Sequence, residues 1–178
     1  MSIPDQQLSP HFMLSEFVRS ETAARYEIDN TPPAAVVERL RNNARGMEQV
    51  RVRLNGVVVH ISSGYRCPEL ERAIVGPAYP RWCAKHGRAV DEASWLDYLK
   101  NKAHPRGDAT DFEAPAFGAP YAICRELEGS DIAFDQLIWE HTWVHVGWAR
   151  EGELPRREVL TLEPGGNYAL GIVEHTQV

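Results

Sequence analysis

The sequence predicts an α+β fold, with helices in the N-terminal part that pack against a mostly antiparallel sheet. The first third of the chain carries apolar residues at three- and four-residue spacing, which is typical of one face of an amphipathic helix. These residues are Val37, Leu40, Ala44, Met47, Val50 and Leu54. Two β-rich runs, 134–139 and 143–148, are separated by a few polar residues and predict a hairpin. Helices followed mostly by hairpin-linked strands favour the α+β class.

Two helices are expected near the N-terminus. A short one is expected to start at residues 14–17, with Ser15 able to cap it. Residues 29–33 then break the chain, and either Asn30 or Thr31 can cap the long helix that carries the apolar stripe, with a proline in its first turn.

One strand and one helix are expected next. Residues 57–61 are β-branched and apolar, so they predict a buried strand in which His60 is a satisfied core histidine. A further helix is expected after Pro68.

Residues 76–102 show no regular pattern, because prolines such as Pro77 and a glycine interrupt them. We expect an elaborated loop that contains one short helix over 90–99. Long loops in compact domains are usually functional or mobile. The segment is therefore interpreted as an insertion into a single domain that spans residues 1–178.

The C-terminal half is expected to contain both strands and a helix. Residues 109–112 suit a short strand and residues 120–127 suit a helix. The tail contains two further β-rich runs, 158–162 and 168–173, on either side of a Pro-Gly-Gly-Asn turn.

Composition limits the class of protein. The 178 residues fit one domain with one core, and 43% hydrophobic and 25% charged residues are ordinary for a soluble globular chain. A net charge of −6 argues against a protein that holds nucleic acid by its phosphates. No apolar run is long enough to span a membrane. We also expect the protein to be a monomer. The three cysteines form no CxxC pair, so neither a disulfide framework nor a cysteine-based zinc site is expected.

Two histidines and one aspartate stand out as candidate metal ligands. His104 precedes Asp111 by seven residues, and Gly107 between them allows a sharp turn that can bring the two together. His145 lies in the second strand of the expected hairpin. Two imidazoles and one carboxylate with an open fourth position are typical of catalytic zinc. The spacing is loose, however, and a site without metal remains an alternative.

The hairpin suggests a general base. If Glu140 and Trp143 flank a two-residue turn, Ile138 lies opposite His145 and Glu140 projects from the same sheet face. Glu140 could then accept a proton from the attacking water. The alternative is an exposed glutamate at a hairpin end.

Arg66 follows the tight turn Ser62-Ser63-Gly64-Tyr65. An arginine there can pair with a substrate carboxylate or stabilise an oxyanion. The alternative is a structural salt bridge, to Asp111 or Glu113.

At these residues the chain resembles the zinc D-Ala-D-Ala peptidases of the M15 type, whose fold is shared with the hedgehog signalling domain. The family's SGYR element stands at 63–66, its HxxGxAxDF element at 104–112, and its WVHV element at 143–146 after Asp-Gln-Leu-Ile at 135–138. The similarity extends over most of residues 8–160.

The resemblance implies a zinc metallopeptidase that cleaves bacterial peptidoglycan, as a D,D-carboxypeptidase or a cross-link endopeptidase. One zinc ion would be held by His104, Asp111 and His145. Arg66 would bind substrate or transition-state charge, and Glu140, or alternatively His141, would be the base. Candidate substrate-binding residues, besides Arg66, are Ser63, Tyr65, Gln136 and Trp143.

Two departures from the family concern the substrate, and one concerns the base. A serine usual two residues before the first ligand histidine is Lys102 here, and the insertion at 76–102 replaces a short link. Some relatives have an acid where this chain has Thr142. The alternative function is a non-catalytic zinc module, such as an interaction domain or a phage structural part.

The N-terminus has no basic stretch followed by an apolar one, so no signal peptide is expected and the protein would stay in the cytoplasm as synthesised. Action on the cell wall would then require release, as for a phage lysis enzyme (an endolysin) or a virion-borne enzyme.

Overall fold

The computed structural model describes residues 5–76 and 78–174. Pro77, one of the prolines from which we predicted a loop, lies outside the described residues, as do the first four residues of the chain. The described residues form seven α-helices, one 3₁₀ turn and two sheets, which confirms the α+β class.

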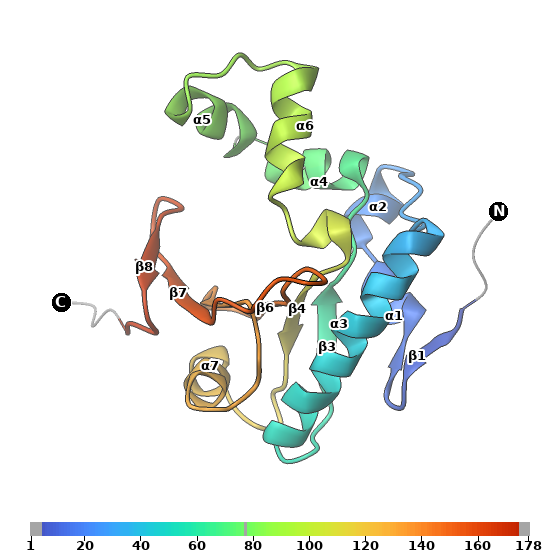
Figure 1. Ribbon diagram of the computed structural model, residues 1–178, viewed down its shortest axis with the longest axis vertical. Helices are drawn as coiled ribbons and strands as arrows, with labels where there is room; N and C mark the ends of the chain where they lie inside the picture. The colour runs from blue at the N-terminus through green and yellow to red at the C-terminus, as the bar shows by residue number, and fades with distance from the viewer. Residues whose placement is uncertain (1–4, 77, 175–178) are drawn as a thin grey trace.

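A six-stranded sheet runs through the molecule in the order β3-β4-β6-β5-β7-β8 (Figure 1). Neighbouring strands are antiparallel except for the parallel pair β5 and β7. The strands are β3 (His60–Ser63), β4 (Ala109–Glu113), β5 (Gln136–Trp139), β6 (Val144–Gly147), β7 (Glu158–Leu162) and β8 (Tyr168–Leu170). A small hairpin precedes them, made of β1 (Gln7–Ser9) and β2 (Phe12–Met13).

Helices lie in the N-terminal part of the chain and also between the later strands, where one was predicted over 120–127. They are α1 (Leu14–Val18), α2 (Glu21–Arg25), α3 (Ala34–Arg53), α4 (Pro68–Val75), α5 (Ala78–Lys85), α6 (Glu92–Lys100) and α7 (Pro120–Glu128), with the 3₁₀ turn η1 (His104–Arg106). None of the helices in the described segments has the length and apolar character needed to cross a bilayer.

The two faces of the sheet have different roles. Phe112, Val144 and Leu137 belong to the main core with the apolar stripe of α3 and the buried face of α7. Because successive side chains of a strand alternate between faces, Asp111 and His145 project to the opposite side. One face therefore stabilises the fold, and the other is available for a site.

The long helix is confirmed, but its start differs from the prediction. Pro33 occupies the N-cap position and makes no side-chain cap. The Asn30 amide instead donates to the carbonyls of Val18 and Tyr65, and its Oδ1 accepts from the Cys67 backbone N–H. Asn30, one of the two predicted capping residues, therefore joins segments that are distant in the sequence.

Two other N-terminal predictions were wrong. Ser15 lies inside α1, and the backbone N–H of Met13 is satisfied by Glu16 at 2.7 Å instead. The strand predicted over 57–61 is β3, which begins only at His60, and this histidine is exposed. Ile61 takes the inward position, so alternation turns His60 outward.

The segment 76–102 is more ordered than predicted. The single helix expected over 90–99 is α6, but a second helix, α5, precedes it. Pro80 falls in the first turn of α5, where a missing backbone N–H is tolerated. These helices, at the top of Figure 1, enclose a second cluster of buried residues, Tyr79, Cys83, Trp95 and Tyr98.

Asn43 joins α3 to the segment between His104 and Asp111. It is 1% exposed, and its amide donates to the carbonyls of Gly107 and Ala109, both at 3.1 Å. Its Oδ1 accepts from Thr110 Oγ1 and Trp148 Nε1, both at 2.8 Å. The side chain thus uses all of its hydrogen-bonding capacity in the core.

We expect Asn43→Ala to lower the free energy of unfolding by roughly 2–4 kcal/mol, because three buried polar partners and the half-buried Trp148 indole lose their hydrogen bonds. Chemical denaturation measures the change. Asn42→Ala is the matched control, since Asn42 is the exposed neighbour on the same helix. Equal stability of the two variants would contradict the role given to Asn43.

Candidate metal centre

Strand pairing brings Asp111 and His145 together. The two residues are direct partners across β4 and β6, and the His145 Nδ1 lies 2.8 Å from Asp111 Oδ1. The predicted pairing of Ile138 with His145 across β5 and β6 is confirmed. Asp111 and His145 therefore share one rigid row of the sheet.

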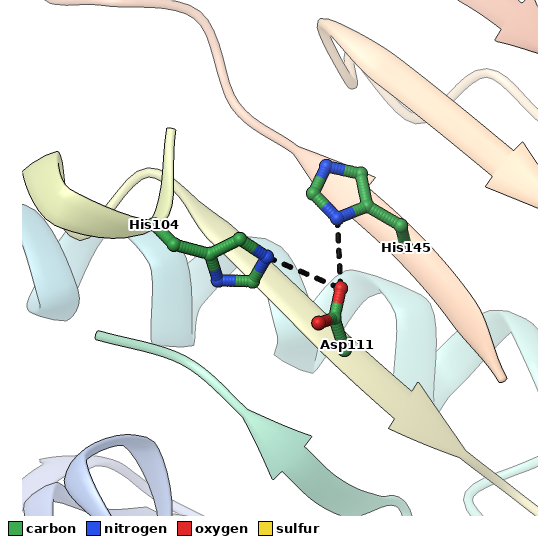
Figure 2. A group of neighbouring side chains, drawn as sticks. All are labelled: His104, Asp111 and His145. Carbon is green, nitrogen blue, oxygen red and sulfur yellow. Dashed lines mark hydrogen bonds and ion pairs between the residues drawn. The ribbon is translucent and has the colours of Figure 1, made fainter. Parts of the chain in front are cut away.

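His104 reaches the same point from the 3₁₀ turn η1 that precedes β4. Gly107 ends this turn with a φ of 78°, the left-handed conformation that glycine adopts readily, so the sharp turn predicted there is confirmed. The His104 Nδ1 lies 2.6 Å from the carbonyl of Gly64, and its Nε2 lies 3.2 Å from Asp111 Oδ1 (Figure 2). A carbonyl at Nδ1 selects the tautomer in which Nε2 is free of hydrogen and faces Asp111.

Gly64 itself is held against α1. A Cβ atom at this position would lie 2.6 Å from the Phe17 carbonyl oxygen, so any side chain would push the turn away. The glycine lets the turn approach closely enough to orient His104.

The three side chains form a group that can hold a metal ion. One ligand atom from each lies within 4.8 Å of the others, and all three residues are buried. Burial lowers the pKa of His104, which favours the neutral imidazole that a metal requires. Burial alone would raise the pKa of Asp111, but its interactions with His104 and His145 outweigh this and hold the pKa well below its usual range. A neutral imidazole and an ionised carboxylate fit a divalent cation.

Arg66 belongs to this group through its ion pairs. Its Nη2 lies 2.6 Å from Asp111 Oδ2, its Nη1 lies 3.5 Å from Glu71 Oε2, and its Nε donates to Ser63 Oγ at 2.9 Å. The structural salt bridge to Asp111 is thus present, whereas Glu113 makes none with Arg66 among the described residues. Arg66 leaves Oδ1 of Asp111 to the histidines.

A cavity of about 590 Å³ opens over the three residues. It lies between the helices of the 76–102 segment and the strands β5 to β8. Charged and polar residues line it, including Arg66, Lys102, Gln136, Glu140 and Tyr168. An open space beside three ligands is what a catalytic metal needs and a structural one lacks.

Of the two candidate bases, the cavity contains Glu140. It is half-buried, and its backbone N–H donates to the Trp143 carbonyl at 3.2 Å, which closes the hairpin as predicted. His141 is exposed, with its Nε2 2.7 Å from the Leu162 carbonyl, and is not among the described lining residues.

Burial raises the pKa of Glu140, and the negative charge of Asp111 raises it further. The folded protein therefore holds the proton more tightly than the unfolded chain does, so ionised Glu140 costs stability at neutral pH.

We expect metal-free Glu140→Gln to be more resistant to urea than the wild type at pH 7, because glutamine carries no charge to bury. The difference should vanish when the pH falls below the ordinary glutamate value of 4.5, where the unfolded chain is protonated as well. A chelator must be present, since a bound cation would lower this pKa. Equal stability at both pH values would argue against the raised pKa.

The structure places some of the candidate substrate-binding residues at the cavity and one of them in the core. Gln136 and Trp143 line the cavity, and Ser63 is half-buried beside Arg66. Tyr65 is only 5% exposed and packs in the main core, where burial raises its pKa to about 12. The structure thus does not bring Tyr65 to the cavity, because its side chain packs in the main core.

Three further lining residues did not stand out as site residues in the sequence. Glu71 is 3% exposed and pairs with Arg66. In the sequence it is one residue of the predicted helix after Pro68, and no motif marks it. Tyr168 comes from the edge strand β8 and is 52% exposed. Lys102 was noted only as a departure from a motif. The sequence signal that could have identified Glu71 is a carboxylate on the side of α4 that faces the protein interior.

Comparison with known proteins gives a match to a family model. No curated protein matches the chain. Residues 10–94 match the family model described as Peptidase M15. The matched range includes Arg66 and the turn before it but ends before His104, so the three candidate ligands lie outside it. The match, which spans slightly less than half of the chain, supports the resemblance to the M15-type peptidases that the motifs predict.

Proposed function

We propose that this protein is a zinc-dependent peptidase that hydrolyses peptide bonds in the stem or cross-link peptides of bacterial peptidoglycan. The observation that carries the proposal is the buried His104–Asp111–His145 group at the base of a cavity that also contains Glu140. The family match supports peptide hydrolysis in general. The peptidoglycan substrate rests on the motif resemblance.

In this proposal His104 Nε2, Asp111 Oδ1 and His145 Nδ1 are the zinc ligands. Zinc bound there would polarise the scissile carbonyl and lower the pKa of water to near neutrality. The backbone carbonyl of Gly64 keeps His104 oriented, and the Arg66 guanidinium keeps Asp111 oriented through its second oxygen. The ligands are thus held in place before the ion arrives.

Glu140 is proposed to take the proton from the attacking water and to deliver it to the leaving amine. Glu140 lines the same cavity as the three proposed ligands, and one carboxyl group can accept the proton and then donate it. Arg66 adds positive charge where the oxyanion develops, and a side chain that is already ion-paired needs little reorganisation to do so.

Cleavage of defined muropeptides tests the proposal. Protein purified without added zinc is analysed for metal content, then incubated with muropeptides of known structure, and the products are identified by mass spectrometry. We expect about one zinc per chain, new peptide termini, loss of cleavage with a chelator and recovery with zinc. The products also distinguish a carboxypeptidase from an endopeptidase.

Zinc binding without cleavage of any muropeptide would overturn the enzymatic proposal and favour a non-catalytic zinc module. Cleavage that persists in the chelated protein would overturn the role of the metal.

A further inference from the structure

The basic residues that line the cavity differ in how their charge is balanced. Arg66, Lys102, Arg106 and Arg156 line it. Arg66 pairs with Asp111 and Glu71, whose side chains are 6% and 4% exposed. Its charge is therefore balanced inside the protein.

The other two arginines are also engaged. Arg106 Nε lies 2.9 Å from Asp108, and its Nη1 donates to the carbonyls of residues 100 and 102. Arg156 pairs with Asp135 at 2.6 Å and with Glu158 at 3.3 Å. Their donors are directed towards the protein.

Lys102 is the exception among these four. Its Nζ lies 4.3 Å from the centroid of the Tyr98 ring, and no carboxylate of the described residues pairs with it. The ring attracts the ammonium group without neutralising it, and Tyr98 is itself buried in α6. Lys102 is half-buried, so its charge is less screened than that of a surface lysine.

Lys102 lies two residues before the candidate ligand His104, and both residues line the cavity. A divalent ion would add further positive charge to this space, and Asp111 is already paired. Of the other carboxylates that line the cavity, Glu71 and Asp135 are paired with arginines, and Glu140 is the proposed base. Among the described lining residues, Lys102 is therefore the cationic side chain left to bind an anionic group near the cleaved bond.

We propose that Lys102 determines specificity by binding a carboxylate of the substrate next to the scissile bond. This inference rests on the proposed peptidase function and names its substrate class, which is acidic peptides. The carboxylate is either the C-terminal one or that of an acidic side chain beside the bond. Both offer the same charge-assisted hydrogen bond to the ammonium group.

Paired substrates test the proposal. One pair of muropeptide-derived peptides differs only in a free or amidated C-terminus, and a second pair only in a free or amidated acidic side chain. For one of the two pairs, we expect the zinc-loaded wild type to prefer the free acid by about tenfold or more in kcat/KM. The pair that responds identifies the source of the carboxylate.

Lys102→Met keeps the length of the side chain and removes its charge. We expect the preference to fall to near unity, with unchanged zinc content, while Lys102→Arg retains part of it. Lys100→Met is the matched control, because Lys100 is 72% exposed and pairs with Asp97 outside the cavity. A wild type without preference in either pair would overturn the proposal, as would Lys102→Met with its preference intact.

Binding separates this proposal from the peptidase function. Calorimetry with the zinc-loaded Glu140→Gln variant measures the affinity for each peptide without turnover. The same measurement is made on the double variant that also carries Lys102→Met. If the acid binds more tightly only when Lys102 is present, the subsite stands even when no peptide is cleaved. If peptides are cleaved but acid and amide behave alike, the peptidase stands and the subsite fails.

Discussion

Replacement of His104 by alanine is expected to abolish zinc binding and peptide cleavage together. The variant leaves one imidazole and one carboxylate, and it removes the side chain that the Gly64 carbonyl orients. Loss of an outer partner of a metal ligand typically costs about 10–100-fold in affinity, and loss of a ligand should cost more. Calorimetric titration with zinc and the muropeptide assay measure the two effects.

His60→Ala is the control for this prediction. His60 is an exposed histidine on β3, in the same sheet but away from the cavity lining among the described residues. We expect it to bind zinc and to cleave like the wild type. Cleavage by a His104→Ala protein that binds no zinc would refute the metal mechanism.

The second large effect is expected for Glu140→Gln. Glutamine has nearly the same shape but cannot accept the proton, so kcat should fall by about 100- to 10,000-fold, as is typical when a general base is lost. Zinc affinity should change little, because Glu140 is not one of the three clustered ligands. Steady-state kinetics and zinc titration of the same preparation separate the two properties.

His141→Ala distinguishes the two candidate bases. His141 is exposed and bonded to the Leu162 carbonyl, so its removal should leave kcat close to that of the wild type. A large loss in His141→Ala together with a small one in Glu140→Gln would reverse the assignment of the base.

Local signals in the sequence predicted most elements correctly. The spacing of apolar residues predicted α3, and the alternation around a two-residue turn predicted the register of Ile138 against His145. These features depend on neighbours within a few residues, and so the chain encodes them directly. The start of α3 could not be predicted in this way, because Asn30 is used by Val18, Tyr65 and Cys67 from other segments.

The helix α5 illustrates a second limit. The proline in its first turn predicts a break in regular structure, but packing of α5 into the aromatic cluster with Trp95 and Tyr98 stabilises the helix. Tertiary packing of this kind outweighs intrinsic propensity.

The sequence by itself determined which residue types are available for chemistry: two histidines and an aspartate near a flexible glycine, a glutamate at a hairpin end, and an arginine after a tight turn. Only the tertiary structure decided how they are used. It brought His104, Asp111 and His145 within reach of one ion, turned Tyr65 into the core, and balanced the charge of Arg66 with Glu71 and Asp111. The physical reason is that pairing between strands and ion pairs between distant segments depend on packing across the whole fold, which local periodicity does not record.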